Sequence, residues 1–328
     1  MDSKRIILSG VQPTGKLHLG NYEGALKNWV SLQDDYRMYL CVVDWHSLTS
    51  DFDDTAGLQD RILETTIDFL AAGLDPEKCS MFVQSDVMEH AELHLLLSML
   101  IPISWLERVP SYKEKSQLLG LDSYGFLGYP LLQAADILLY KAHAVPVGKD
   151  QLPHIELTRE VARRFNNLYG NVFPEPESLL SEFSAIPGTD GRKMSKSYNN
   201  DIKLADSPEE TAAKIKKMIT DPQKVYKGDP GRPEICPVYA LHKVYTGDTK
   251  DIFEGCKSGS LGCAEDKKRV VENINNVLAP LRARRKELEK DGGYVLRILK
   301  KGAQEARECA MATMDDVRKA MNLTGKNA

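Results

Sequence analysis

Long hydrophobic runs are missing from this sequence of 328 residues. No stretch approaches the roughly 20 consecutive apolar residues that a membrane-spanning helix needs. The apolar run at residues 6–8 is far too short for a secretion signal and is typical of a first strand. We therefore expect a protein that stays in the cytoplasm and has no membrane partner.

A strong excess of charge, low-complexity sequence and internal repeats are missing as well. The formal net charge is −4, so any nucleic acid would have to bind at local basic patches, because the protein's overall electrostatic field does not attract it. The six cysteines do not imply disulfides in a cytoplasmic protein. With 42% apolar and 27% charged residues, the chain has the composition of a globular protein and the length of one large domain plus a smaller one.

Short apolar runs alternate with helical patterns over the first two thirds of the chain. The runs occupy residues 6–8, 38–43, 81–83 and 144–147. Strands that alternate with helices predict a parallel sheet with right-handed crossovers, and such sheets bind ligands at the carboxyl ends of their strands. The loops expected at that edge contain residues 9–10, 44–46 and 148–150.

The later part of the chain has a different pattern. A helix is predicted to begin at Ser207, with a proline next and a Ser-x-x-Glu capping box. Beyond a Pro- and Gly-rich connector, the sequence is helical and highly charged from about residue 264, with one break at residues 291–293. We predict an α/β, Rossmann-like catalytic domain over residues 1–200. An α-helical domain is expected over residues 201–328, and its end can return to the first domain.

Residues 10–21 form the first of two segments with features of a phosphate site. A Pro-Thr-Gly turn follows the first predicted strand, and Gly20 opens a helix, so backbone N–H groups can approach an anion closely. His18 can donate from its imidazole and Asn21 from its amide. A plain strand–turn–helix with a surface histidine explains this segment alone equally well.

The second segment, residues 187–197, places Lys193 and Lys196 on a glycine-rich loop. Lysine is a mobile point charge that can follow phosphate charge during a reaction, whereas an isolated basic cluster is usually a solvated loop. The sequence contains no Gly-x-x-x-x-Gly-Lys-Ser/Thr P-loop. Together the two segments favour a nucleotide that is attacked at its α-phosphate, with the lysines stabilising the departing pyrophosphate.

Tyr129, Gln133 and Asp136 lie on one face of a helix predicted from about residue 130 to 142. Their neighbours leave this helix apolar nearly all round, so the polar groups need buried partners such as a substrate. A polar stripe facing solvent is the plainer alternative. Asp136 suits an indole N–H, which only donates. A tyrosine phenol also donates, so these residues alone favour tryptophan and tyrosine almost equally as the substrate.

The two phosphate segments resemble the HIGH and KMSKS motifs of class I aminoacyl-tRNA synthetases. Residues 193–197 match the second motif letter for letter, and residues 18–21 match the first except that Asn21 replaces its final histidine. This Gly-Asn-Tyr context is similar to the tryptophan-specific branch of the class. Further similarity to tryptophanyl-tRNA synthetases covers residues 43–46, 129–140, 147–151, 154–159 and 162–166.

The resemblance implies an enzyme that joins tryptophan to tRNA(Trp) in two steps. The tryptophan carboxylate attacks the α-phosphate of ATP, which gives tryptophanyl-adenylate and pyrophosphate, and the terminal ribose of the tRNA then attacks the adenylate carbonyl. Catalysis of this kind relies on positioning and electrostatic stabilisation. The resemblance also implies a homodimer and a Mg²⁺ ion for which no protein ligand can be named.

Two alternatives stay open at this point. One is a tyrosyl-tRNA synthetase, because such enzymes share a similar Tyr-x-x-x-Gln-x-x-Asp pattern. The other is a catalytically silent paralogue that binds tryptophan or RNA as a regulator. The intact pair of phosphate segments argues against the silent paralogue, since a regulator does not need both.

The site residues implied by the resemblance are those at the matching motif positions. The expected catalytic residues are His18, Lys193 and Lys196. The expected ATP-binding residues are Gln12, Pro13, Thr14, Gly20, Asn21, Gly148, Lys149, Asp150, Ile186, Lys193, Met194, Ser195, Lys196 and Ser197. The expected tryptophan-binding residues are His46, Tyr129, Gln133, Asp136 and Gln151. Lys149 departs from the family's usual glutamate, and Gln133 stands where many tryptophanyl enzymes carry methionine.

Three cysteines precede the predicted helical bundle: Cys236, Cys256 and Cys263. Their layout resembles a subgroup of tryptophanyl enzymes that hold a [4Fe–4S] cluster with four cysteines, but Asp266 stands at the fourth position here. Such clusters prefer thiolates, although a carboxylate can serve. The favoured alternative is three reduced structural cysteines.

A basic cluster lies near the end of the long predicted helix, at Arg282, Arg284, Arg285 and Lys286. On an exposed helix this pattern indicates a solvated face that is balanced by the nearby glutamates. The resemblance places anticodon recognition in this region, where phosphate contacts would be made.

Overall fold

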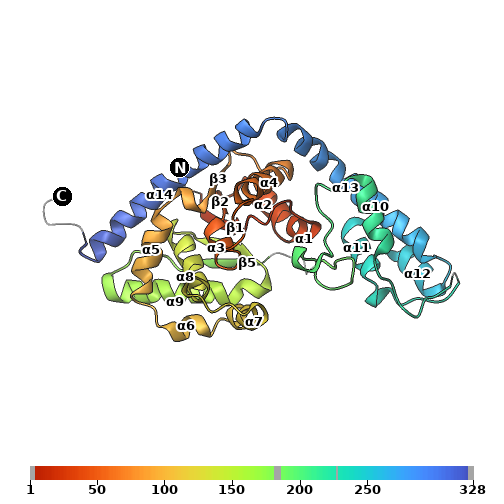
Figure 1. Ribbon diagram of the computed structural model, residues 1–328, viewed down its shortest axis with the longest axis horizontal. Coiled ribbons are helices and arrows are strands. Elements are labelled where there is room, and N and C mark those ends of the chain that lie inside the picture. The colour runs from red at the N-terminus through yellow and green to blue at the C-terminus, as the bar shows by residue number, and fades with distance from the viewer. Residues whose placement is uncertain (1–3, 181–185, 227, 324–328) are drawn as a thin grey trace.

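The centre of the molecule is a five-stranded sheet (Figure 1), in a computed structural model that describes residues 4–180, 186–226 and 228–323. The strands run in the order β3-β2-β1-β4-β5, and each neighbouring pair is parallel. Their bounds are β1 (Ile6–Val11), β2 (Arg37–Val42), β3 (Cys79–Val83), β4 (Ala144–Val147) and β5 (Glu177–Leu180). The predicted α/β fold class with a parallel sheet is confirmed.

Successive side chains of the central strands divide between two hydrophobic clusters, one on each face of the sheet. On β2, Met38, Leu40 and Val42 belong to one cluster, whereas Tyr39 and Cys41 belong to the other. This period of two is the geometry of an extended strand. Because both faces are covered, β2 and β3 are apolar almost throughout, as expected for a parallel sheet.

The helices of the first part connect the strands and cover the sheet. Their bounds are α1 (Leu19–Asn21), the π-helical turn η1 (Tyr22–Leu26), α2 (Lys27–Leu32), α3 (Asp44–Leu48), α4 (Leu58–Ala71), η2 (Gln84–Asp86), α5 (Glu89–Ser98), α6 (Ile103–Glu107), α7 (Pro110–Leu119), α8 (Tyr124–Leu139), η3 (Lys149–Gln151) and α9 (Leu152–Tyr169). The helix α8, which carries Asp136, begins earlier than predicted. Ser123 caps it by accepting the N–H of Phe126, and Pro130 lies inside the helix.

The later part of the chain is helical, as the sequence predicts. Its elements are η4 (Lys196–Tyr198), α10 (Pro208–Lys217), η5 (Pro233–Ile235), α11 (Pro237–Tyr245), α12 (Lys250–Ser258), α13 (Cys263–Leu288) and α14 (Gly292–Ala320). The predicted capping box is present, because Ser207 Oγ accepts the N–H of Glu210 and the Glu210 carboxylate accepts that of Ser207. None of the described helices is long and apolar enough to cross a membrane.

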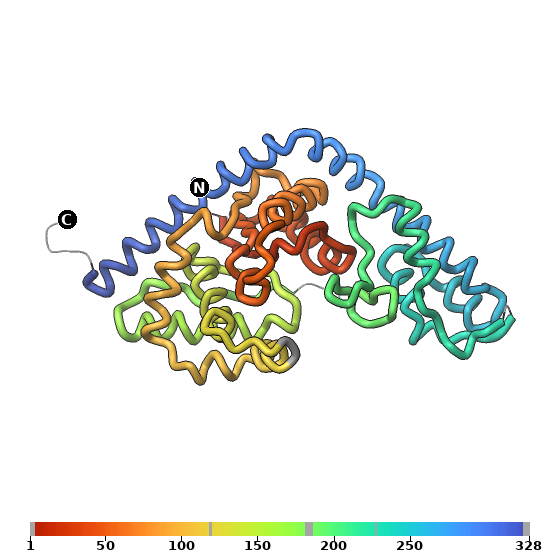
Figure 2. The backbone as a smooth tube through the Cα atoms, viewed as in Figure 1, coloured from red at the N-terminus to blue at the C-terminus, as the bar shows by residue number. Residues whose placement is uncertain are grey.

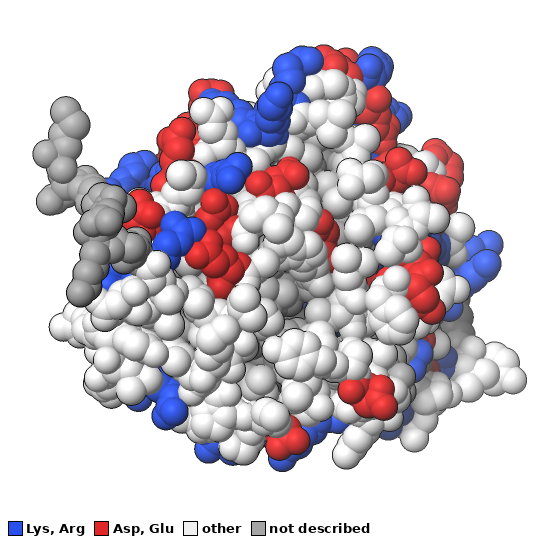
Figure 3. All heavy atoms as spheres, turned by 60° about the vertical axis from the view of Figure 1, so that its left-hand side comes forward, with Lys and Arg blue, Asp and Glu red and all other residues white. Residues whose placement is uncertain are grey.

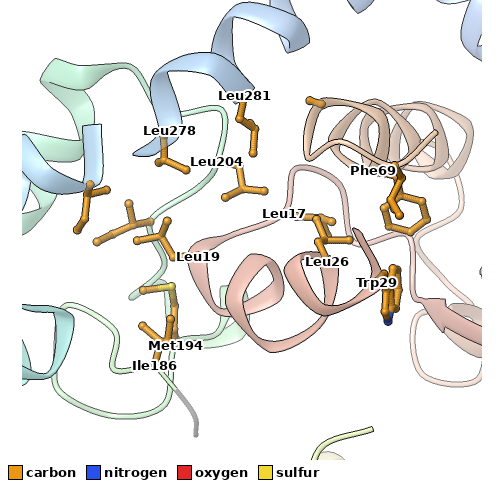
Figure 4. Close-up of a cluster of buried hydrophobic side chains, with 14 of the residues drawn as sticks. Leu17, Leu19, Leu26, Trp29, Phe69, Ile186, Met194, Leu204, Leu278 and Leu281 are labelled. Atoms are coloured by element: carbon orange, nitrogen blue, oxygen red, sulfur yellow. The ribbon is translucent and has the colours of Figure 1, made fainter. Parts of the chain in front are cut away.

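The helix α14 returns from the helical part to the sheet (Figure 2). It packs against β3 so closely that a Cβ atom on Gly302 would lie 1.9 Å from the carbonyl oxygen of Met81. Glycine is the residue that permits such an approach between two backbones. One hydrophobic cluster joins both parts of the chain, and Figure 4 shows Leu204, Leu278 and Leu281 next to the segment that carries Leu17.

Candidate active site

The two predicted phosphate segments lie in contact with each other. Lys196 Nζ donates to the carbonyl oxygens of Thr14 and Gly15 at 2.9 and 3.0 Å and to Thr14 Oγ1 at 2.8 Å. The chain after the second segment pairs with the first, because Leu19 N–H donates to the carbonyl of Ile202 at 2.9 Å. Residues nearly two hundred positions apart therefore form one surface at the carboxyl end of β1.

His18 is the residue that caps α1. Its Nδ1 accepts the backbone N–H of Asn21 at 3.3 Å, while Asn21 Oδ1 accepts the N–H of His18 at 3.1 Å. Burial, together with the positive charges of Lys196 and Lys193, lowers the pKa of His18 to about 4. The imidazole is therefore neutral near pH 7. Since Nδ1 acts as an acceptor, the proton is on Nε2, which can donate to a phosphate.

Gly20 allows the first segment to turn tightly around His18. A Cβ atom on Gly20 would lie 2.9 Å from the His18 ring and 3.7 Å from the Cβ atom of Met194. Glycine at this position therefore keeps the start of α1 open, which is the property that a phosphate-binding helix start requires.

The second segment is anchored by buried side chains. Met194 is 3% exposed and Ile186 is 4% exposed, and Figure 4 shows both next to Leu19 in the hydrophobic cluster. Met194 N–H also donates to the carbonyl of Ile186 at 2.9 Å. Both are predicted to bind ATP; their buried side chains fix the loop in place, which leaves their backbone groups to face a ligand.

Asn200 is a positioning residue that the sequence did not reveal. This buried side chain accepts the N–H of Ser195 at 2.8 Å and donates to the carbonyl of Lys193 at 3.2 Å and to Asp190 at 2.7 Å. A Cβ atom on Gly188 would lie 2.3 Å from it. Its place just beyond the motif is the only signal that could have pointed to it.

The lysines of the second segment lie in different environments. Lys196 is partly buried, and this burial lowers its pKa to about 8. Lys193 is exposed, with its Nζ 3.8 Å from the carboxylate of Asp150 in the loop after β4. The predicted ATP residues of that loop, Gly148 and Lys149 included, thus lie opposite the second segment. A Cβ atom on Gly148 would meet Asp150 Oδ1 at 2.6 Å.

Asp136 is the centre of a buried hydrogen-bond network on α8. Its Oδ2 lies 2.8 Å from His46 Nε2, and its Oδ1 lies 2.7 Å from His90 Nδ1 and 2.8 Å from Gln84 Nε2. Burial alone would raise the pKa of Asp136, but the hydrogen bonds from His46 and His90 outweigh it and hold the pKa well below the usual range. The side chain is therefore a carboxylate that accepts hydrogen bonds.

The structure adds Gln84 and His90 to the predicted residues around Asp136. Gln84 directly follows β3, so the rule that ligands bind at the carboxyl ends of strands could have found it. His90 lies on α5, and no pattern in the sequence distinguishes it.

The other residues predicted to bind the substrate tryptophan make two further sets of side-chain contacts. Gln133 Nε2 donates to Gln151 Oε1 at 3.5 Å. The Tyr129 hydroxyl lies 2.8 Å from Ser111 Oγ, which in turn contacts His154 Nε2. Gln12, which was predicted to bind ATP, donates to the carbonyl of His46 at 3.2 Å. This bond connects the nucleotide segment to the amino-acid side of the site.

In the part of the chain that the structure describes, the three cysteines are not arranged as a metal centre. Among the residues that the structure describes, no group of three or more His, Cys, Asp or Glu side chains is arranged to hold a metal ion. Burial raises the pKa of the Cys236 and Cys256 thiols, and Asp266 Oδ1 lies 3.0 Å from His242 Nε2. The residues therefore do not fit the [4Fe–4S] cluster that the resemblance implies, and no step is assigned to it.

The prediction that the basic cluster on α13 is solvated is wrong for two of its members. Arg282 is 8% exposed and Arg285 is 2% exposed. Arg285 forms ion pairs with Asp68 and Glu64 on α4, and Asp68 also accepts the N–H of Leu17 at 2.6 Å. The sequence shows only the glutamates on the same helix, whereas the acidic partners on α4 are brought in by the fold.

Comparisons with known proteins agree with the fold. The chain belongs to the family of class I tRNA synthetases for tryptophan and tyrosine, described as tRNA synthetases class I (W and Y), which matches residues 2–279. Within that family it falls in the tryptophanyl branch, as the motifs predict. A tryptophan–tRNA ligase of Thermotoga maritima is 52% identical over 97% of this chain and 99% of its own length.

Two further relatives support the same branch. A tryptophan–tRNA ligase of Aquifex aeolicus is 45% identical over 97% of this chain and 99% of its own length. The crystal structure of tryptophanyl-tRNA synthetase from Campylobacter jejuni, complexed with ADP and tryptophan, is similar with a TM-score of 0.86 and 36% identity. It matches 97% of this chain and 99% of its own.

Proposed function

We propose that the site described above activates L-tryptophan with ATP and transfers it to tRNA(Trp), so that the protein is a tryptophan–tRNA ligase. The observation that carries this proposal is the contact between the two phosphate segments. Lys196 reaches the turn at Thr14 and Gly15, so phosphates bound by the N–H groups of the first segment would lie beside the lysine charge. A nucleotide between the segments would be held from both sides.

In the first step, each residue has a role that its charge state supports. The neutral His18 donates its Nε2–H to a phosphate oxygen, and Lys193 and Lys196 stabilise the negative charge on the departing pyrophosphate. The attacking group is the carboxylate of tryptophan. No protein nucleophile is required, and catalysis comes from positioning.

The amino acid is recognised at Asp136. An indole N–H only donates, and Asp136 is an ionised acceptor in a buried site. A substrate without this donor would leave a buried lone pair without a partner, which is costly and therefore selective. Gln133 and Gln151 lie close enough together to contact the same amino acid.

ATP brings Mg²⁺ to the site and the tRNA brings its terminal ribose. The ion supplies positive charge at the phosphates, and we propose that phosphate and water oxygens hold most of it, as is usual for Mg²⁺. The helical domain over residues 201–328 is proposed to face the anticodon. Because charged tRNA is used by ribosomes in translation, we also propose a cytoplasmic location.

Pyrophosphate exchange into ATP, measured separately with tryptophan and tyrosine, tests the proposed function. We expect exchange with tryptophan, and exchange with tyrosine that is at least about 10³-fold less efficient. Charging of tRNA(Trp) should follow with tryptophan alone. Exchange with tyrosine only would indicate a tyrosyl enzyme, and exchange with neither would indicate a catalytically silent protein.

We also propose that the protein is a homodimer that associates through α5. The exposed side chains Met88, Leu95 and Met99 lie at spacings of seven and four and form one stripe, while Leu93 and Leu97 face the core. The helix is thus apolar on two sides. Figure 3 brings forward this side of the molecule and shows a broad area with few charged residues in its lower half. Exposed apolar patches of this kind are typical of interfaces.

Light scattering on the purified protein tests the dimer. The mass should be twice that of the chain, and Met99→Glu should shift it to the monomer because a charge would be buried at the interface. Met311→Glu is the matched control, since Met311 is also exposed but lies on α14. A native monomer, or a dimer that tolerates Met99→Glu, would contradict this assignment.

A further inference from the structure

His90 is a fully buried histidine with a hydrogen-bond partner at each ring nitrogen. Its side chain is 0% exposed. Nδ1 lies 2.7 Å from Asp136 Oδ1, and Nε2 lies 2.8 Å from the hydroxyl of Tyr140, which is also 0% exposed. A buried histidine with two hydrogen-bond partners could have a purely structural role in the core, but here one nitrogen faces the carboxylate that is proposed to bind the substrate side chain.

The contact with Asp136 shows that Nδ1 of His90 carries a proton. Asp136 is ionised, so it can only accept, and Nδ1 must donate to it. Burial raises the pKa of the Tyr140 hydroxyl well above its ordinary value, so that hydroxyl keeps its proton. Nε2 of His90 lies within hydrogen-bond distance of that hydroxyl, so the contact with Tyr140 holds the ring with Nδ1 toward Asp136.

The two oxygens of Asp136 are therefore not equivalent. A carboxylate has about four lone-pair positions. Oδ1 accepts from both His90 and Gln84, which fills it, whereas Oδ2 accepts from His46 alone among the described residues. One position remains, on Oδ2, and an indole has a single N–H to place there.

We propose that His90 is a positioning residue for tryptophan recognition, because it saturates Asp136 Oδ1 and thereby leaves Oδ2 as the only oxygen that can accept the indole N–H. This inference rests on the proposed function, since it takes Asp136 as the reader of the indole. Residues Gln84 and Tyr140 support His90 from either side.

A tryptophan analogue in which sulfur replaces the indole N–H, β-(benzothiophen-3-yl)alanine, tests the inference. The measurement is kcat/KM in pyrophosphate exchange for tryptophan and for the analogue, and their ratio is the preference for the N–H. His90→Asn keeps an amide N–H near the Nδ1 position, whereas His90→Gln carries it near the Nε2 position, toward Tyr140. The two variants differ by one methylene and keep the same chemistry.

We expect the native protein and His90→Asn to show a large preference for tryptophan over the analogue. In His90→Gln the preference should fall about 10- to 100-fold, the effect of one lost hydrogen bond to a charged group, with KM for ATP unchanged. His94→Gln is the matched control, because His94 lies on the same helix and contacts Gly128, and among the described residues no hydrogen bond joins it to Asp136, although its ring senses the charge of that carboxylate. Its preference should match the native one.

The possible failures are distinguishable. If the native protein shows no preference for tryptophan over the analogue, the proposed role of Asp136 is wrong, and the inference about His90 falls with it. If the native protein shows the preference and His90→Gln keeps it, His90 has only a structural role and the inference alone is overturned. Thermal unfolding of both amide variants shows whether either has lost the fold.

Discussion

At the scale of single residues, burial sets the charge states on which the site depends. His18 and Lys196 lie on opposite segments, burial is the main cause of the lowered pKa of each, and the charge of Lys196 also lowers the pKa of His18. The result is a neutral imidazole beside a lysine that is still charged at pH 7. A phosphate bound between them would meet one neutral donor and one full positive charge.

The pKa of Lys196, about 8 in the free protein, predicts the basic limb of the pH profile. The lysine is charged below this pKa and loses its charge as the pH rises through it. We therefore expect kcat/KM for ATP, which reports the free enzyme, to fall above about pH 8. Lys196→Arg should remove this limb, because arginine stays charged. An unchanged basic limb in Lys196→Arg would assign it to another group.

Removing the Lys196 charge should affect the reaction much more than binding of the amino acid. In Lys196→Ala we expect adenylate formation to slow by about 10²- to 10³-fold. The equilibrium affinity for tryptophan in the absence of ATP, measured by titration, should change less than about twofold. Equal losses in both quantities would contradict a role at the phosphates.

At the scale of elements, the sequence predicts the buried strands better than it predicts the edge strand β5 or the start of helix α8. The four apolar runs correspond to β1, β2, β3 and β4, because a strand buried on both faces needs an unbroken apolar run. The edge strand β5 has exposed ends and only four residues, Glu177–Leu180, so it carries no such signal. The early start of α8 is set by the cap at Ser123, outside the apolar pattern.

The close packing of α14 on β3 predicts a large effect of a single methyl group. In Gly302→Ala the new Cβ would overlap the Met81 carbonyl, and the helix would have to move away from the strand. We expect a loss of about 3 kcal/mol or more in the free energy of unfolding, measured in urea.

Gly125→Ala on α8 is the matched control for this substitution. No atom lies within 4 Å of the Cβ that it would add. Alanine favours a helix over glycine by up to about 1 kcal/mol, so the control should be neutral or slightly stabilising. A similar loss in both variants would show that the contact with Met81 does not limit stability.

At the scale of the whole molecule, Arg285 connects α13 to α4 and, through Asp68, to the first phosphate segment. Arg285→Ala would leave the buried Asp68 without its positive partner, and breaking a buried pair in this way costs about 3–5 kcal/mol. We expect this loss in urea unfolding and a raised KM for ATP, because Asp68 also holds the N–H of Leu17.

The neighbouring Arg284 offers the control for that prediction. It is exposed on the same helix, and Arg284→Ala should change the free energy of unfolding by less than about 0.5 kcal/mol. A native-like KM for ATP in Arg285→Ala would show that the first segment does not depend on this ion pair.

The candidate site was predictable where its residues lie in local motifs, and not where they meet through the fold. His18, Lys193 and Lys196 are found from their spacing along the chain. Gln84 and His90 reach Asp136 from other elements, and Arg285 finds Asp68 across more than two hundred residues. Partners of this kind are decided by packing, which a single sequence does not display.

The position of α14 in the chain has a consequence for synthesis on the ribosome. The edge strand β3 ends at Val83, but the helix that packs against it begins only at Gly292. At about 5–20 residues per second, translation of the intervening chain takes on the order of 10–40 seconds. During this time β3 is an uncovered strand edge, which is prone to pair with other chains. The nascent protein therefore depends on its last helix to close its sheet.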